Sequence, residues 1–283
     1  MPRAGGPCDW PASRKMLLQK IGVLLCLWAM PCALARAQAE PIETDNPSLA
    51  NSSKTVGEGV FQWESGVLHL DPRRRLERAR RGRTDRDDAD ESAEGSYASA
   101  PNLFRLGVSP DLELRFESEM LAHQSNLSGF SDVSLGFKWT LAEGDDRSVG
   151  LIGSLTPPSG KTPFRTNSFT PTLIVASDFA ITEDQTLTLN LGGSWVDNER
   201  LDRRIFESFG AICYNWDLGE QWTAYLEVAV SGPEASSQAF ETIADAGLGY
   251  RPTPNSIINL ALFRGLSHQG IDWGTSLSFG LRL

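Results

Sequence analysis

The chain has 283 residues and a formal net charge of −10 at pH 7, with 36 acidic against 26 basic residues. This excess of negative charge argues against a nucleic-acid partner, because phosphate backbones are bound by clustered positive charge. Three of the four cysteines (Cys8, Cys26 and Cys32) lie near the N-terminus. If that region is removed, no intramolecular disulfide is possible.

The first 39 residues have the pattern of a secretory signal peptide. Lys20 precedes an apolar run over residues 21–28, and small residues follow up to Ala37 and Ala39, after either of which cleavage is expected. A membrane-anchoring helix needs about 20 uninterrupted apolar residues, and Pro31 breaks this run. We therefore predict a signal peptide over residues 1–39, with residues 1–15 as an extended n-region, and export through the inner membrane.

The chain that remains is more acidic and has one cysteine. The removed segment contains five basic residues and one acidic residue, so the mature net charge is near −14. Cys213 lies in an alternating segment and is predicted to be a buried structural thiol rather than a nucleophile. Residues 40–58 show no regular period, and we expect them to form a periplasmic N-terminal segment.

From residue 59 onward, apolar and polar residues alternate with the period of β-strands. Residues 187–191 (Leu-Thr-Leu-Asn-Leu) are a clear example. The pattern predicts twelve strands, most with about the ten residues of a tilted membrane strand. They are expected at residues 59–70, 98–108, 111–121, 130–142, 147–157, 168–180, 185–196, 204–216, 221–231, 240–252, 255–264 and 271–283.

The connections between these strands alternate between short and long in strict order. Short turns are expected at residues 109–110, 143–146, 181–184, 217–220 and 253–254. Longer loops are expected at residues 71–97, 122–129, 158–167, 197–203, 232–239 and 265–270. This order is typical of an antiparallel up-and-down transmembrane β-barrel, here over residues 59–283, with short turns and both termini on the periplasmic side. The alternative fold is a soluble periplasmic β-sandwich that binds a ligand.

Aromatic residues support a barrel in the outer membrane, because they form two groups as interfacial girdles do. Near the short turns lie Phe61, Trp63, Trp139, Trp216, Trp222 and Tyr250, and near the long loops lie Phe169, Trp195, Phe206 and Trp273. The last strand also resembles the C-terminal signal read by the barrel-assembly machinery, although that signal usually ends in an aromatic residue and this chain ends in Leu283. The expected partners are outer-membrane lipid, lipopolysaccharide and this machinery.

Several motifs, in their order and spacing, resemble the meta-pathway of phenol degradation transporter family of outer-membrane β-barrel proteins. They are residues 43–47 (Glu-Thr-Asp-Asn-Pro), 57–66, 104–108 with 112–115, 129–138 and 156–160. The resemblance covers residues 42–283 and implies an outer-membrane channel, associated with passive uptake of aromatic or other small hydrophobic solutes. The solute itself is not given by the sequence.

The predicted loop at residues 71–97 is longer than is usual in that family. It contains eight arginines followed by an acidic cluster at residues 85–94. We interpret it as a solvated extracellular loop, with pairing between its halves or with lipopolysaccharide as the alternative.

The alternation directs a set of charged side chains toward the inside of the barrel. They are Glu64, Arg105, Glu113, Arg115, Glu117, Asp132, Lys138, Glu227, Asp245, Arg251 and Arg282. Their mixed signs fit either a selective constriction along a solute path or a structural set of ion pairs. A non-conducting structural or surface barrel is therefore the alternative to a channel.

No motif indicates an enzyme, a cofactor or a metal site. The three histidines, His69, His123 and His268, lie near the predicted extracellular ends, with serines close to each, but no pattern orders them into a triad. Spacings typical of zinc or calcium ligands are absent. We expect no catalytic residues, no bound cofactor and no nucleic-acid partner.

Overall fold

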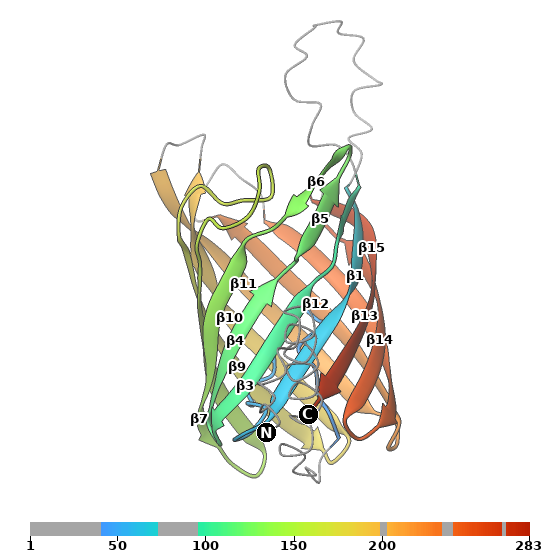
Figure 1. Ribbon diagram of the computed structural model, residues 1–283. Coiled ribbons are helices and arrows are strands. Elements are labelled where there is room, and N and C mark those ends of the chain that lie inside the picture. Colours follow the sequence, from blue (N-terminus) through green and yellow to red (C-terminus); the bar gives the residue numbers. More distant parts are fainter. Residues whose placement is uncertain (1–40, 73–95, 199–202, 234–239, 268–269) are drawn as a thin grey trace, which may run out of the picture. The chain divides into compact units, whose positions relative to one another are not determined.

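The computed structural model describes residues 41–72, 96–198, 203–233, 240–267 and 270–283. Over these residues the chain forms one closed antiparallel β-barrel (Figure 1). The predicted signal peptide and residues 73–95 of the charged loop lie outside the described residues. No helix among those residues is long and apolar enough to cross a membrane.

The barrel is made of twelve strands, three of which are divided into two segments. The undivided strands are β1 (Phe61–Pro72), β8 (Arg147–Thr156), β9 (Thr170–Thr182), β10 (Gln185–Asn198), β11 (Arg203–Asp217), β12 (Trp222–Pro233), β13 (Glu241–Thr253), β14 (Ser256–Gly265) and β15 (Ile271–Arg282). The divided strands are β2 (Tyr97–Ser99) with β3 (Asn102–Ser109), β4 (Leu112–Ser118) with β5 (Leu121–Gln124), and β6 (Leu127–Phe130) with β7 (Val133–Glu143).

The sheet closes where the last strand pairs with the first. β15 lies antiparallel to β1, with Gln62 opposite Arg282 and Leu70 opposite Gly274. Closure satisfies the backbone groups of both edge strands, which a membrane-spanning sheet requires. The predicted barrel is therefore confirmed and the alternative β-sandwich is wrong, because the strands form a single continuous sheet in place of two packed layers.

Side chains alternate across the wall with apolar groups outside and polar groups inside. Leu114 is 51% exposed and Leu191 is 70% exposed on the outer face, whereas Glu113 between two outward leucines of β4 is fully buried. This is the reverse of a soluble fold and suits a wall whose outer face lies in lipid. The exposed aromatics Trp139 and Trp222 lie toward the short turns, and Trp195 lies at the opposite end.

One predicted loop is instead a continuation of the wall. Residues 122–129 were expected to be irregular, but β5 and β6 pair as a hairpin, with Leu121 opposite Phe130. Met120 and Ser125 take left-handed backbone angles, with φ of 47° and 55°. Met120 lies where the strand bends between β4 and β5, and Ser125 lies in the two-residue turn of the hairpin. Polar residues and this bend conceal the strand period in the sequence.

Candidate functional site

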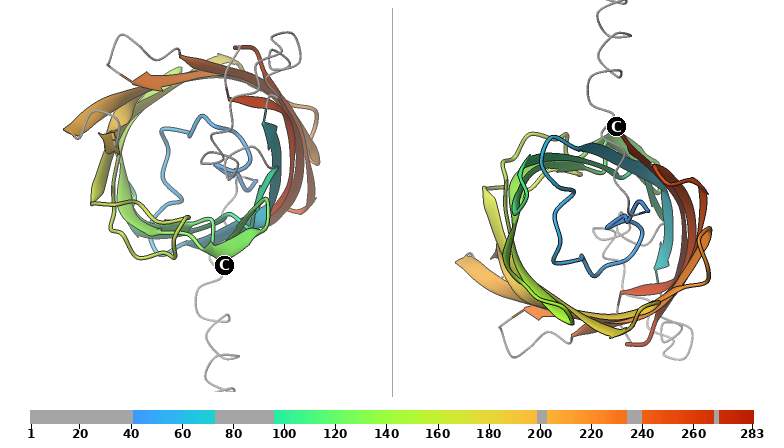
Figure 2. Two further views of the ribbon diagram at one scale, coloured as in Figure 1. Left: turned by 90° about the horizontal axis from the view of Figure 1, so that it is seen from above. Right: turned by 90° about the horizontal axis from the view of Figure 1, so that it is seen from below.

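The candidate site is the lumen of the barrel, which contains residues 41–60, here called the plug segment. Figure 2 shows this segment running inside the wall of strands. Near its start, the Ile42 amide donates to the Pro254 carbonyl at 2.8 Å, and near its end the Gly59 amide donates to the Gly107 carbonyl at 3.0 Å. The periplasmic position expected for residues 40–58 is therefore replaced by a luminal one for the described part, residues 41–58.

The plug segment follows the wall closely at positions where the wall has glycine. A Cβ atom added at Gly150 of β8 would lie 2.4 Å from the Ser53 carbonyl oxygen, and one at Gly107 would overlap the backbone of Gly57. Any larger residue at these two positions would push the segment inward. The glycines thus leave room for the plug segment against β3 and β8.

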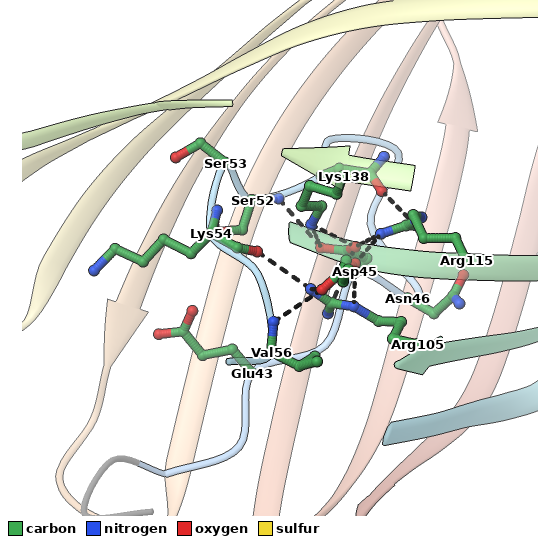
Figure 3. Close-up of polar contacts among 12 residues, drawn as sticks. Glu43, Asp45, Asn46, Ser52, Ser53, Lys54, Val56, Arg105, Arg115 and Lys138 are labelled. Atoms are coloured by element: carbon green, nitrogen blue, oxygen red, sulfur yellow. Dashed lines mark hydrogen bonds and ion pairs between the residues drawn. The ribbon is translucent and has the colours of Figure 1, made fainter. Parts of the chain in front are cut away.

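The strongest attachment is a buried ionic cluster around Asp45 of the plug segment (Figure 3). The Asp45 carboxylate lies 2.6 Å from Nη1 of Arg115 and 2.8 Å from Nζ of Lys138. Arg105 lies 3.6 Å away through Nη1. These three cations come from the neighbouring strands β3, β4 and β7, so one carboxylate joins the plug segment to three strands at once.

Two further carboxylates complete the ionic cluster. Glu113 accepts from Nε of Arg105 at 2.9 Å and from Nη1 of Arg115 at 3.1 Å. Glu64 lies 3.3 Å from Nη1 of Arg105 and also accepts from the Asn46 amide at 2.9 Å. The cluster therefore contains three carboxylates and three cations, all of them buried, and its formal charge is zero.

Charge balance decides the ionisation of Asp45. Burial alone raises the pKa of a carboxyl group, but the nearby Arg105, Lys138 and Arg115 outweigh burial and hold the Asp45 pKa far below its ordinary value. At Glu43, two residues away, burial and the nearby Asp178 outweigh the nearby cations and raise the pKa of the carboxyl group. Asp45 is thus the charged anchor of the plug segment.

A second attachment uses hydroxyl groups in place of cations. The Asp178 carboxylate of β9 accepts from the Ser53 amide and the Ser53 hydroxyl, both at 2.7 Å, and from the Ser52 hydroxyl at 2.9 Å. Thr188 of β10 donates to the other oxygen at 2.6 Å. This carboxylate is satisfied entirely by neutral donors.

A third attachment lies on strands β10 and β12. Glu227 accepts from the backbone amides of Leu49 at 3.1 Å and Ala50 at 2.9 Å. Asn190 pairs with the backbone of Asn51 in both directions, at 2.9 Å each. The plug segment has no regular secondary structure, so these side chains satisfy backbone groups that a helix or strand would satisfy internally.

Space remains beside the plug segment in three cavities among the described residues. The lower cavity, about 180 Å³, is lined by Lys54, Asp184, Asp217 and Arg251 near the short turns. The middle cavity, about 290 Å³, includes Leu68, Leu70, Leu103, Ile243, Phe263 and Ile271. The upper cavity, about 420 Å³, includes Glu117, Glu119, Ser134, Thr156 and Thr172.

The middle cavity shares lining residues with the lower cavity and with the upper cavity. Asn46, Pro47 and Ser48 line both the lower and the middle cavity. Asn51, Arg115, Glu117, Ser118 and Glu119 line both the middle and the upper cavity. The plug segment therefore forms the constriction between the short-turn half and the long-loop half of the lumen.

The structure brings together five of the eleven charged residues that the alternation directed inward. Glu64, Arg105, Glu113, Arg115 and Lys138 form the ionic cluster with Asp45. Glu227 and Asp245 lie buried on the opposite wall, and Glu117 lines the middle and upper cavities.

Three of the predicted residues lie toward the ends of the barrel. Arg251 is buried and pairs with Asp217 at 2.9 Å, and Arg282 donates to Asn255 in a short turn at 3.0 Å. Asp132 lies at the long-loop end. Whether any of the eleven residues lines a solute path stays a prediction.

Asp132 holds the loop between β8 and β9 against the rim. Its carboxylate accepts from the backbone amides of Ser159 and Gly160 at 2.7 Å and of Thr166 at 2.6 Å. Partial burial opposes ionisation, but these three amides outweigh it and lower the pKa of Asp132. The loop over residues 157–169 is thereby ordered above the upper cavity.

The Ser/His pairs considered at the rim do not form a buried catalytic arrangement among the described residues. The His123 ring nitrogen Nδ1 and the Ser128 hydroxyl lie 2.8 Å apart, but both residues are exposed. His69 lies 3.6 Å from Asp71 and has no serine beside it among the described contacts. His268 lies outside the described residues. In the part of the chain that the structure describes, no three His, Cys, Asp or Glu side chains come together as metal ligands.

Comparison with protein families identifies the chain through residues 44–283, which match the family described as "Putative MetA-pathway of phenol degradation". The chain belongs to this family. The match begins within the plug segment and extends to the end of the barrel, as the resemblance of the sequence motifs implied. No curated protein matches the chain.

Solved structures with a similar fold include an outer membrane channel and two porins. The COG4313 outer membrane channel from Pseudomonas putida F1 is 14% identical, with a TM-score of 0.60, covering 85% of this chain and 100% of that one. The NanC porin is 11% identical, with a TM-score of 0.53, covering 77% and 97%. The KdgM porin is 10% identical, with a TM-score of 0.51, covering 77% and 98%. At these identities the likeness concerns the fold, and these neighbours are porins and channels.

Sequence reasoning missed the plug segment and its anchor Asp45 as parts of the lumen. Strand periodicity points only to residues of the wall, and the plug segment has no period. The family motif at residues 43–47 contains Asp45 and was the available signal. The three inward cations Arg105, Arg115 and Lys138 outnumber the carboxylates beside them on their strands. A search for an additional carboxylate outside the strands would have pointed to Asp45.

Proposed function

We propose that this protein is a passive channel of the outer membrane in which small solutes pass beside the plug segment. The observation that carries the proposal is the series of three cavities with shared lining residues on both sides of the Asn46–Pro47–Ser48 constriction. Family membership and the apolar outer face support it. The neighbouring folds named as outer membrane channel and porin support it as well.

We further propose that the solutes are small aromatic or other hydrophobic molecules with a polar group. The middle cavity supports this class, because leucine, isoleucine and phenylalanine residues line it together with serine and asparagine residues. A site of this kind holds the apolar part of a molecule and orients its polar part. The description of the family points to the same class.

A planar-bilayer measurement on the refolded mature chain tests the channel. Single-channel steps are expected, and a variant lacking residues 41–58 should show larger steps because the constriction is gone. A variant lacking residues 73–95 is the matched control and should retain the small steps. If neither the intact chain nor the plug-deleted variant conducts, the non-conducting structural barrel is the correct function.

The location and the solute class have separate tests. A heat-modifiable gel shift and a detergent requirement for extraction are expected for an outer-membrane barrel. Phenol added to a conducting channel should interrupt the current more often than a sugar of similar size, since the sugar has no apolar face for the middle cavity. Equal effects of the two solutes would contradict the proposed class.

A further inference from the structure

Arg115 has hydrogen-bond donors that the ionic cluster does not use. A guanidinium group has five N–H donors. Nη1 of Arg115 donates to Asp45 at 2.6 Å and to Glu113 at 3.1 Å, and Nη2 donates to Asn51 at 3.1 Å. The Nε hydrogen and the second Nη2 hydrogen have no acceptor among the described residues. The side chain is only 6% exposed, so these two donors need an acceptor that the described residues do not supply.

The Arg115 side chain lies at the junction of two cavities. It lines both the middle cavity, about 290 Å³, and the upper cavity, about 420 Å³. A small molecule in either cavity can therefore contact this side chain, although the protein buries nearly all of it. The complementary group on such a molecule is an oxygen atom with free lone pairs, as in a hydroxyl or a carbonyl group.

The middle cavity adds an apolar surface to these donors. Leu103, Ile243 and Phe263 are among the residues that line it together with Arg115. Binding sites of this composition hold the hydrocarbon part of a ligand against apolar side chains and orient its polar part with a few hydrogen bonds. The middle cavity and Arg115 together fit a molecule that has a hydrocarbon body and an acceptor oxygen.

Two carboxylates without a cation lie at the same junction. Glu117 and Glu119 follow Arg115 at alternate positions of the chain, and both line the middle and the upper cavity. Neither carboxylate forms a salt bridge or a hydrogen bond with another side chain in the part of the chain that the structure describes. Because the ionic cluster has a formal charge of zero, these two groups make the junction negative. A negatively charged solute is repelled there, whereas a neutral one is not.

We infer that the junction of the middle and upper cavities selects neutral solutes with a hydrocarbon body and an acceptor oxygen, and excludes the corresponding carboxylates. Arg115 donates to the oxygen, and Glu117 and Glu119 exclude the anions. The inference rests on the proposed function, since it specifies the charge and the polar group of the solutes that pass the plug segment. A phenol, a hydrophobic alcohol or an amide meets these requirements.

Equilibrium binding of benzamide and benzoate tests the inference, because the two molecules have nearly the same shape and differ in charge at neutral pH. Isothermal titration calorimetry of the refolded mature chain in detergent, with the heat of empty micelles subtracted, requires no conduction. Benzamide should bind about 10-fold more tightly than benzoate, or more. Benzylamine that binds more tightly than benzamide would assign the junction to cations and overturn the inference.

Removal of the two carboxylates should produce a gain of binding. In the double variant Glu117→Gln with Glu119→Gln, benzoate should bind about as tightly as benzamide, whose own affinity should stay the same. A variant that fails to fold cannot produce this gain. The matched control is Asp145→Asn with Asp146→Asn, which removes the same charge from exposed positions of a short turn and should retain the preference for benzamide.

Arg115→Lys tests the donors. Lysine keeps a positive charge beside Asp45 but has neither the Nε donor nor the planar fork of arginine. The affinity for benzamide should fall about 10-fold. Protection of residues 41–60 from protease shows whether the plug segment has stayed in place, and the double variant decides the question if it has not.

Equal affinity of the intact chain for benzamide and benzoate would overturn the inference, as would the absence of binding by both. A double variant that retains the preference would overturn it as well. Conductance tests the proposed channel separately. A chain that conducts without discriminating between the two probes keeps the channel and loses this inference, and a chain that discriminates without conducting does the reverse.

Discussion

The two sides of the lumen differ in whether their buried charges are paired with opposite charges. The wall of β3, β4 and β7 contributes three cations that are matched by Glu64, Glu113 and the plug-segment residue Asp45. The wall of β12 and β13 contributes Glu227 and Asp245 without a cation among the described salt bridges. Complete pairing makes the first wall an ionic anchor of the plug segment, whereas the second wall binds plug amides through Glu227 alone.

Asp45→Ala should have the largest effect, because it leaves Arg115, Lys138 and Arg105 facing one another without their shared anion. Breaking a buried ion pair in this way costs about 3–5 kcal/mol. The plug segment should leave the wall, which a protease cutting within residues 41–60 and a larger single-channel conductance would both detect. Asp145→Asn, at an exposed position of a short turn, is the control, and a plug that stays protected in Asp45→Ala contradicts the anchoring role.

Glu227→Gln should have a smaller effect, since it weakens the acceptor of two backbone amides but strands no cation. A buried hydrogen bond with a charged partner lost in this way costs about 1–3 kcal/mol. The free energy of unfolding in urea should fall by less than in Asp45→Ala. An equal or larger loss would show that the β12–β13 wall holds the plug segment as firmly as the ionic cluster.

Acid should distinguish Asp45 from an ordinary aspartate. Its pKa in the folded protein is lowered, so its stabilising contribution is present above the ordinary aspartate pKa and is lost only as the pH falls through the lowered value. The plug segment should stay protected from protease at a pH where a free aspartate is largely protonated. Release of the plug segment at that pH would contradict the electrostatic balance within the ionic cluster.

Asp132→Asn should have the smallest and most local effect. The pKa of Asp132 is also lowered, so its hold on residues 157–169 is present above the ordinary aspartate pKa and is lost as the pH falls through the lowered value. Hydrogen exchange of the Ser159, Gly160 and Thr166 amides should accelerate in the variant at neutral pH, and in the intact chain only in acid. Unchanged exchange would mean that other contacts hold the loop.

The strands were predictable because lipid and lumen impose a strict period on each of them. The predicted segment at residues 185–196 corresponds to β10 (Gln185–Asn198), and that at 255–264 to β14 (Ser256–Gly265). The hairpin of β5 and β6 was missed, because the bend at Met120 and the polar residues of the hairpin conceal the strand period. Inward charges such as Glu113 and Lys138 were found by the same alternation.

The sequence by itself determined the barrel, its strand number and the polarity of its two faces, since each follows from local period and loop length. Only the tertiary structure decided that Asp45 meets Lys138 across 93 residues, and that Glu227 accepts the Leu49 and Ala50 amides of the plug segment. These facts depend on which side chains an irregular segment meets after the sheet has closed. Closure brings together residues that are far apart in the sequence, and the local alternation of apolar and polar residues does not predict such contacts.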